Sequence, residues 1–188
     1  QISEVSQTSE IWERTKMDFP VTLLNFLRKA ERVAALTGAG VSQESGLRTF
    51  RDAQTGLWAQ YQPEDLASPE GFARNPKLVW DWYAMRREKV RNVEPNAGHY
   101  ALAEIGHRVP HFTLITQNVD GLHRRAEQTL KVSESFGVWM EYPILELHGN
   151  IQRVRCAECG MYADAWEDNG DVPRCAGCGG MLRPDVVW

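Results

Sequence analysis

Short apolar runs and segments with helical periodicity alternate along the chain. Apolar residues at helical spacing predict helices at residues 21–30, 65–92 and 95–103, the second of them with a break at Pro76. The short apolar runs, bounded by polar or glycine-containing loops, predict strands at residues 32–37, 112–116 and 144–147. Strands that are separated by helices are typical of an open parallel sheet, so the pattern predicts an α/β fold.

Polar or glycine residues collect directly after each predicted strand. Gly38, Ala39 and Gly40 follow the first strand, residues 117–121 follow the second, and His148 stands at the end of the third. In open parallel sheets, ligands bind beyond the carboxyl ends of the strands. The sequence therefore predicts a functional site at this edge of the sheet.

The two ends of the chain differ in character. Residues 1–18 are polar and lack a strong period, so we expect a loose tail there. Residues 186–188 are β-branched and apolar and are predicted to begin a strand. Because the first residue is Gln1 and the other end reads as the start of a strand, we expect the chain to be a fragment of a longer protein.

Composition narrows the classes of protein that fit. The 188 residues are 43% hydrophobic, and acids outnumber bases by 25 to 21, for a net charge of −4. This balance argues against a nucleic-acid partner, because proteins that bind phosphate backbones usually carry a basic surface. There is no run of 18 apolar residues and no apolar signal sequence, so we expect no membrane span or membrane partner. The clustering of all four cysteines favours a reducing compartment, so we expect a cytoplasmic location.

The four cysteines lie in one short window, as Cys156-x-x-Cys159 and Cys175-x-x-Cys178. Two residues between cysteines allow both thiolates to reach one ion, and two such pairs complete a tetrahedral zinc site. Two structural disulfides or a chance pairing of the motifs are the alternatives, which the clustering disfavours. Because four thiolates close the coordination shell, the predicted zinc is structural and does not need His148 as a ligand.

The glycine loop after the first predicted strand is a weaker signal. Gly38 and Gly40 allow a phosphate to approach the backbone closely, and a helix start behind them would offer free N–H groups. The spacing departs from G-x-G-x-x-G, because the next glycine is Gly46. Taken alone, the loop fits a dinucleotide site and a plain turn about equally well.

Four motifs occur together in a fixed order: GAGVSQESGLRTFR, TQNVDGLH, LELHGN and the paired CxxC knuckles. In this combination the chain resembles a bacterial-type sirtuin over about residues 19–188. The resemblance implies a Rossmann-like parallel sheet with a small zinc-ribbon module and a helical insertion at about residues 55–95. It divides the chain into an NAD-binding domain at 19–149, a zinc module at 150–183 and, at 184–188, the start of a return to the sheet whose C-terminal part is missing.

The resemblance also implies an activity, NAD-dependent protein-lysine deacylation. The acyl group would pass from an acylated-lysine protein or peptide to ADP-ribose, with release of nicotinamide. His148 matches the family's general base, and an imidazole that titrates near neutrality suits the removal of a proton from a ribose hydroxyl. Asn118 and Asp120 match residues that bind the nicotinamide carboxamide. The residues expected to bind NAD are Gly38, Ala39, Gly40, Ser42, Thr49, Phe50, Arg51, Gln117, Asn118 and Asp120.

Tyr83 and Arg86 stand three residues apart in a predicted helix, so their side chains share one face. In the sirtuins, a Tyr-x-x-Arg pair at this place marks members that accept succinyl- or malonyl-lysine. We therefore expect the pair to bind the carboxylate of such an acyl group. The alternative is a solvated basic face, because Arg87, Lys89 and Arg91 lie close by in the sequence.

The chain departs from the sirtuin pattern in two places. Arg48-Thr49 stands where many members have Pro-Asp, in a form that resembles bacterial members. Residues 124–144 are more numerous than the family's usual link and are predicted to contain a surface insertion, a loop near the cofactor or a partner contact. Two other functions stay open: mono-ADP-ribosyl transfer from the same NAD pocket, and a non-catalytic NAD- or zinc-dependent binding module.

Overall fold

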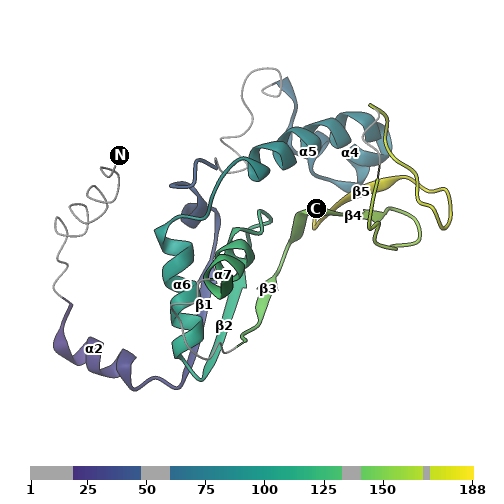
Figure 1. The fold of residues 1–188 in the computed structure, drawn as a ribbon. Helices are drawn as coiled ribbons and strands as arrows, with labels where there is room; N and C mark the ends of the chain where they lie inside the picture. Colours follow the sequence, from purple (N-terminus) through teal and green to yellow (C-terminus); the bar gives the residue numbers. More distant parts are fainter. Residues whose placement is uncertain (1–18, 48–59, 133–140, 167–169) are drawn as a thin grey trace, which may run out of the picture. The chain divides into compact units, whose positions relative to one another are not determined.

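The structure is a computed structural model that describes residues 19–47, 60–132, 141–166 and 170–188 (Figure 1). The chain divides into two compact units, residues 1–31 and residues 32–188, and each is described by itself. The first unit contains helix α2 (Val21–Arg28), which begins directly after Pro20. A helix is therefore present where the apolar periodicity predicts one.

Three strands of the second unit form a parallel sheet in the order β1–β2–β3 (Figure 1). They are β1 (Arg32–Thr37), β2 (His111–Thr116) and β3 (Ile144–Glu146). Thr37 at the end of β1 pairs with Thr116 at the end of β2, which in turn pairs with Glu146 at the end of β3. All three strands thus end at the same level, and the prediction of a parallel sheet whose loops meet at one edge is confirmed.

Two helices connect these strands, α6 (Ala97–Arg108) and α7 (Leu122–Val132). They pack against each other, and α6 also packs on β2. The sequence analysis predicted α6 but not α7, and it placed an insertion in residues 124–144. Most of the first half of that stretch is the regular connecting helix α7, whereas residues 133–140 lie outside the described part of the chain.

Three consecutive helices form the segment that precedes α6: α3 (Pro63–Leu66), α4 (Pro69–Arg74) and α5 (Pro76–Arg91). Each begins with a proline, which is favourable because the first turn of a helix does not use that N–H. The side chain of Asn75 accepts a hydrogen bond from the backbone N–H of Leu78 at 3.1 Å and caps α5. The helix predicted at 65–92 is therefore three helices, and Pro76 starts the longest of them.

A second, antiparallel sheet consists of β4 (Gly149–Cys156) and β5 (Leu182–Val186). Helix α5 packs on both strands, and Val79, Trp82 and Ile151 are fully buried in the shared core. The strand predicted to start at Val186 in fact ends there. Its earlier part has the sequence Leu-Arg-Pro-Asp, in which a proline and two charged residues hide the strand pattern.

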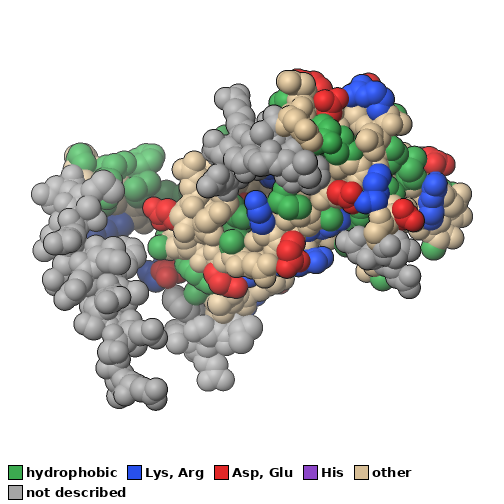
Figure 2. All heavy atoms as spheres, turned by 90° about the horizontal axis from the view of Figure 1, so that it is seen from above, with side chains coloured by type: hydrophobic (Ala, Val, Ile, Leu, Met, Phe, Trp, Pro, Cys, Tyr) green, Lys and Arg blue, Asp and Glu red, His purple; other side chains and the backbone are tan. Residues whose placement is uncertain are grey.

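The described surface carries charges of both signs. Figure 2 shows Lys and Arg side chains interspersed with Asp and Glu side chains on one face of the second unit. Within the described ranges, none of the helices has the length and apolar character needed to cross a membrane.

Candidate active site

The carboxyl edge of the parallel sheet borders a cavity of about 720 Å³. The loops after β1, β2 and β3 line one side of it, and α5, β4 and β5 line the other. The polar residues that these loops contribute are Ser42, Gln117, Asn118, Asp120 and His148. The cavity thus lies at the edge of the sheet where the sequence predicts a functional site.

Ser42 is the centre of a buried hydrogen-bond network. A short 3-10 helix, Ala39–Ser42, follows β1 and brings the serine hydroxyl to the loop after β2. Ser42 Oγ donates to Asp120 Oδ2 at 2.8 Å and accepts from Asn118 Nδ2 at 3.0 Å. All three side chains are buried, so these bonds fix the amide and the carboxylate beside the cavity.

His99 of α6 also belongs to this network, through a contact with Ser42. The backbone N–H of Asn96 donates to His99 Nδ1 at 3.2 Å, so the neutral ring carries its proton on Nε2, which lies 3.4 Å from Ser42 Oγ. Burial lowers the pKa of His99 and the charge of Asp120 partly opposes this, so the ring is neutral at pH 7. The sequence analysis did not single out His99. The Asn96-x-x-His99 spacing can reveal the helix cap but not the contact with Ser42.

His123, the last residue of the TQNVDGLH motif, is also buried. Its Nε2 lies 2.9 Å from Thr37 Oγ1, which donates to Thr116 Oγ1 at 2.9 Å. The pKa of His123 is lowered to about 4, mainly by burial and also by the neighbouring His99, while the charge of Asp120 opposes the shift. The neutral ring joins the ends of β1 and β2, which fits a role in bracing the loop after β2.

His148 lies between β3 and β4, at the border of the cavity, and its side chain is exposed. Its Nδ1 is 3.1 Å from the carbonyl oxygen of Gln117. Because a carbonyl oxygen only accepts, Nδ1 must donate, and Nε2 of the neutral ring is then the nitrogen that can take up a proton. His148 therefore has the tautomer and the position that a general base at this cavity needs.

Position 149, directly after His148, needs a glycine for two reasons: its backbone has a positive φ, and the neighbouring strand leaves no room for a Cβ. Its φ is +79°, and a Cβ at this position would lie 2.1 Å from the backbone oxygen of Asp185 on β5. We expect Gly149→Ala to lower the free energy of unfolding by about 2–4 kcal/mol, through left-handed strain and a clash between strands. Urea denaturation of the variant measures this loss.

Gly170 provides the matched control for that measurement. It also has a positive φ, +90°, but an added Cβ would meet no described atom within 4 Å. Gly170→Ala thus carries the backbone strain without the clash, and its cost should stay near 1 kcal/mol. Equal losses in the two variants would show that the contact with Asp185 is unimportant.

Tyr83 and Arg86 both line the cavity, on the wall formed by α5. Tyr83 is buried and its hydroxyl accepts a hydrogen bond from Trp188 Nε1 at 3.0 Å; the Arg86 guanidinium carbon lies 4.7 Å from the centre of the Trp82 ring. Burial raises the pKa of Tyr83 and lowers that of Arg86, whereas their mutual interaction opposes both shifts. Both side chains face one cavity, and their predicted role in binding an acyl group stays a prediction.

The neighbouring basic residues of α5 do not form one solvated face. Arg87 is buried, and its guanidinium carbon lies 4.5 Å from the centre of the Trp80 ring. Lys89 and Arg91 are exposed. Of the cations in this part of α5, Arg86 therefore lines the cavity, Arg87 lies in the core, and Lys89 and Arg91 are exposed.

The four cysteines come together at the tip of the two-stranded sheet. Their sulfur atoms all lie within 4.8 Å of one another, with Cys156 Sγ 3.5 Å from Cys178 Sγ and Cys159 Sγ 3.7 Å from Cys175 Sγ. Zn–S bonds of about 2.3 Å in a tetrahedron place sulfur atoms about 3.8 Å apart, so the cluster fits a zinc ion. In each knuckle the glycine after the second cysteine, Gly160 or Gly179, has positive φ and closes the turn.

Some of the residues predicted to bind the cofactor line the cavity, and others lie outside the described part of the chain. Ala39, Ser42, Gln117, Asn118 and Asp120 line the cavity. Gly38 and Gly40 flank Ala39 in the loop after β1, whereas residues 49–51, the predicted Thr49, Phe50 and Arg51, lie outside the described part of the chain. The sequence analysis gave no role to Trp188, which also lines the cavity and which no motif in the sequence connects with Tyr83.

Comparison with known proteins identifies relatives along most of the chain. A protein of Ralstonia nicotianae named NAD-dependent protein deacylase is 48% identical over 170 residues, which are 90% of this chain and 63% of the relative. A similarly named protein of Aquifex aeolicus is 47% identical over 160 residues, 83% of this chain and 60% of the relative. The chain thus spans about three fifths of the length of these relatives.

A solved structure has the same fold. The crystal structure of a Sir2 homolog–NAD complex is 42% identical to this chain and superposes with a TM-score of 0.74 over 91% of this chain and 62% of the other. This likeness confirms the predicted Rossmann-like α/β fold. The sequence model of the Sir2 family matches residues 38–188. The chain therefore belongs to the Sir2 family, the sirtuins.

Proposed function

We propose that the complete protein removes acyl groups from lysine side chains of proteins and transfers them to the ADP-ribose part of NAD, with release of nicotinamide. The observation that carries this proposal is the joint placement of His148, Asn118 and Asp120 around one cavity, with the Nε2 atom of His148 available to accept a proton. The names of the curated relatives and the NAD complex of a Sir2 homolog support the same reaction.

The residues around the cavity suit NAD as a ligand. An amide and a carboxylate, those of Asn118 and Asp120, can pair with the donor and acceptor groups of a carboxamide. A Cβ added to Gly38 or Gly40 would meet no described atom within 4 Å, which leaves space for phosphate groups beside the loop. The residues proposed to hold the cofactor are Gly38, Ala39, Gly40, Ser42, Gln117, Asn118 and Asp120, together with Thr49, Phe50 and Arg51.

The side chains of this chain then have distinct tasks in the reaction. Bound NAD supplies a ribose carbon that the acyl oxygen of the substrate attacks as nicotinamide departs. The Ser42 network holds Asn118 and Asp120 in place to orient the nicotinamide end. His148 Nε2 accepts the proton of a ribose hydroxyl as that oxygen attacks the acyl carbon, and the Gln117 carbonyl keeps the ring oriented throughout.

Tyr83 and Arg86 are proposed to bind an acyl group that ends in a carboxylate, such as succinyl. The Trp188 N–H occupies one lone pair of the Tyr83 oxygen, which leaves the phenol proton available to donate. Arg86 adds a charged fork that matches a carboxylate. Acylated-lysine peptides are the proposed substrates, and a Sir2 protein that is 25% identical to this chain has been solved bound to an acetylated peptide.

The function is tested with the complete protein, acetyl- and succinyl-lysine peptides, and mass spectrometry with and without NAD. We expect NAD-dependent loss of the acyl group, release of nicotinamide and formation of acylated ADP-ribose. An ADP-ribosylated protein without acyl transfer would identify ADP-ribosyl transfer instead. No turnover of either peptide would leave a binding role for the cavity.

Substitution of the two α5 residues tests the acyl preference. We expect Arg86→Met to lower kcat/KM for a succinyl peptide by roughly 10- to 100-fold, because a charge-assisted hydrogen bond is lost, and Tyr83→Phe to lower it less. The rate with an acetyl peptide should change little. Arg91→Met, at an exposed position of the same helix, is the control. An equal fall with both peptides would mean that the pair supports the fold rather than selecting the acyl group.

A further inference from the structure

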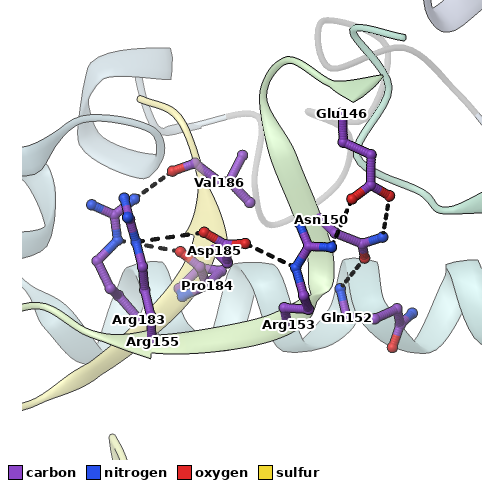
Figure 3. Close-up of polar contacts among 9 residues, drawn as sticks. All are labelled: Glu146, Asn150, Gln152, Arg153, Arg155, Arg183, Pro184, Asp185 and Val186. Carbon is purple, nitrogen blue, oxygen red and sulfur yellow. Dashed lines mark hydrogen bonds and ion pairs between the residues drawn. The ribbon is translucent and has the colours of Figure 1, made fainter. Parts of the chain in front are cut away.

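Two nearly buried carboxylates, one on each sheet, share a single arginine. Glu146 ends β3 of the parallel sheet, Asp185 belongs to β5 of the two-stranded sheet, and both side chains are only 8% exposed. Figure 3 shows Arg153 of β4 between them. Its Nη1 lies 2.7 Å from Glu146 Oε2 and its Nε 2.9 Å from Asp185 Oδ2.

The remaining oxygens of both carboxylates also have partners. Asn150 Nδ2 donates to Glu146 Oε1 at 2.7 Å, and Arg155 Nε lies 3.5 Å from Asp185 Oδ1 (Figure 3). Burial lowers the pKa of Arg153, but its bonds to Asp185 and Glu146 and their charges raise it by more. Arg153 is therefore the common partner in a network that joins the two sheets and in which all four carboxylate oxygens are paired.

This network encloses the segment that carries His148. Glu146 stands two residues before the histidine and Asn150 two residues after it, and both are in the network. On the other side, the backbone at the end of β5 holds the same segment: Val186, the last residue of the strand, pairs with Gly149, and the N–H of the next residue, Val187, donates to the His148 carbonyl at 3.0 Å. The imidazole itself has one described hydrogen bond, to the Gln117 carbonyl.

We propose that Arg153 is a positioning residue for His148: by joining Glu146 on one sheet to Asp185 on the other, it holds the histidine-bearing segment against Gln117. The proposal rests on the proposed function for the role of His148 as the base. Without the Arg153 guanidinium, the nearly buried carboxylates of Glu146 and Asp185 lose the counter-ion that they share. We expect the two carboxylates then to move apart and to displace the segment that carries His148. A shift of about 1 Å at a catalytic group is enough to slow a reaction roughly 100-fold.

Nicotinamide exchange and complete acyl transfer can be measured separately, and a comparison of their rates distinguishes a positioning role of Arg153 from a merely structural one. Exchange of labelled nicotinamide into NAD, in the presence of an acyl peptide, needs only the attack on the ribose carbon and its reversal. Complete acyl transfer also needs the proton to reach His148. In the complete, zinc-loaded protein we expect Arg153→Gln to lower acyl transfer by roughly 10- to 100-fold while nicotinamide exchange changes by no more than about threefold.

Three further variants sharpen the result. Arg153→Lys keeps the charge but not the fork and should recover part of the lost transfer rate. Glu146→Gln keeps one oxygen for Asn150 but replaces the oxygen that accepts from Arg153 with an NH2 group, so it breaks this ion pair and remains informative if Arg153→Gln fails to fold. Arg108→Gln removes an exposed arginine of α6 that pairs with Glu104 and should leave both rates unchanged.

A spectroscopic measurement tests the positioning without any turnover. In protein with ¹⁵N-labelled histidine, the His148 Nδ1–H signal reports the bond to Gln117; we expect it to shift or broaden in Arg153→Gln and to stay in Arg108→Gln. Equal losses of exchange and transfer, or an unchanged His148 signal, would overturn the proposal. If the unmodified protein performs neither reaction, the proposed function fails, and the His148 signal alone decides whether Arg153 positions the ring.

Discussion

Replacement of His148 by alanine is expected to lower acyl transfer by roughly 10²- to 10⁴-fold, because the ribose hydroxyl loses its proton acceptor. Nicotinamide exchange should continue, since the bond between the ribose carbon and the acyl oxygen forms before that proton leaves. The expectation follows from the tautomer: the Gln117 carbonyl fixes the proton on Nδ1 and leaves Nε2 as the acceptor. Product analysis by mass spectrometry and exchange of labelled nicotinamide measure the two steps separately.

His111 supplies the control for this substitution. It is an exposed histidine at the start of β2, at the opposite end of the strand from the cavity. His111→Ala should therefore leave both rates unchanged. Full acyl transfer by His148→Ala would remove His148 from the mechanism, and loss of both steps would indicate that it supports NAD binding or the fold instead.

Loss of one cysteine is expected to have the largest effect on stability. Cys175 is buried with Cys156 beside Trp80, Val154 and Leu182, so this part of the core and the zinc site are one structure. Structural zinc contributes an apparent binding free energy of roughly 10–16 kcal/mol in small zinc domains, which is also folding free energy there. We expect Cys175→Ser to abolish zinc binding and to unfold β4 and β5, which removes one wall of the cavity.

Native mass spectrometry for bound zinc and circular dichroism during heating measure these two effects. Ala157→Ser is the matched control, because it adds a hydroxyl at an exposed position inside the first knuckle without removing a ligand. Stoichiometric zinc in Cys175→Ser, or unchanged thermal unfolding of the metal-free protein, would contradict a structural zinc site.

The elements that the sequence could predict are those whose own residues carry the signal. β1 and β2 are dominated by apolar and β-branched residues, and the cysteine spacing specifies the metal site without any knowledge of the fold. Helix α7 was missed because its buried face is not apolar throughout. His123 and Glu127 are buried beside Leu122 and Ala126, so polar residues interrupt the periodicity that would reveal the helix.

The candidate site also has features that the sequence could predict and others that it could not. The loops that follow the strands could be located because parallel strands that end at one level bring them together. The partners across these loops could not be predicted, because each contact depends on the tertiary fold. Arg153 reaches Asp185, which is 32 positions away, and Trp188 reaches Tyr83, which is 105 positions away. No local pattern in the sequence records such pairs.

The cavity wall formed by α5 is a separate element from the strand ends that carry His148, Asn118 and Asp120. Tyr83 and Arg86 belong to a helix that rests on β4 and β5, whereas the proposed base and the Ser42 network belong to loops of the parallel sheet. On the proposed role of Tyr83 and Arg86, substitutions confined to these positions of one helix alter the contact with the acyl group and leave the Ser42 hydrogen bonds and the contact between His148 and Gln117 in place. If the proposed function holds, the residues that select the acyl group and those that carry out the chemistry can vary separately in evolution.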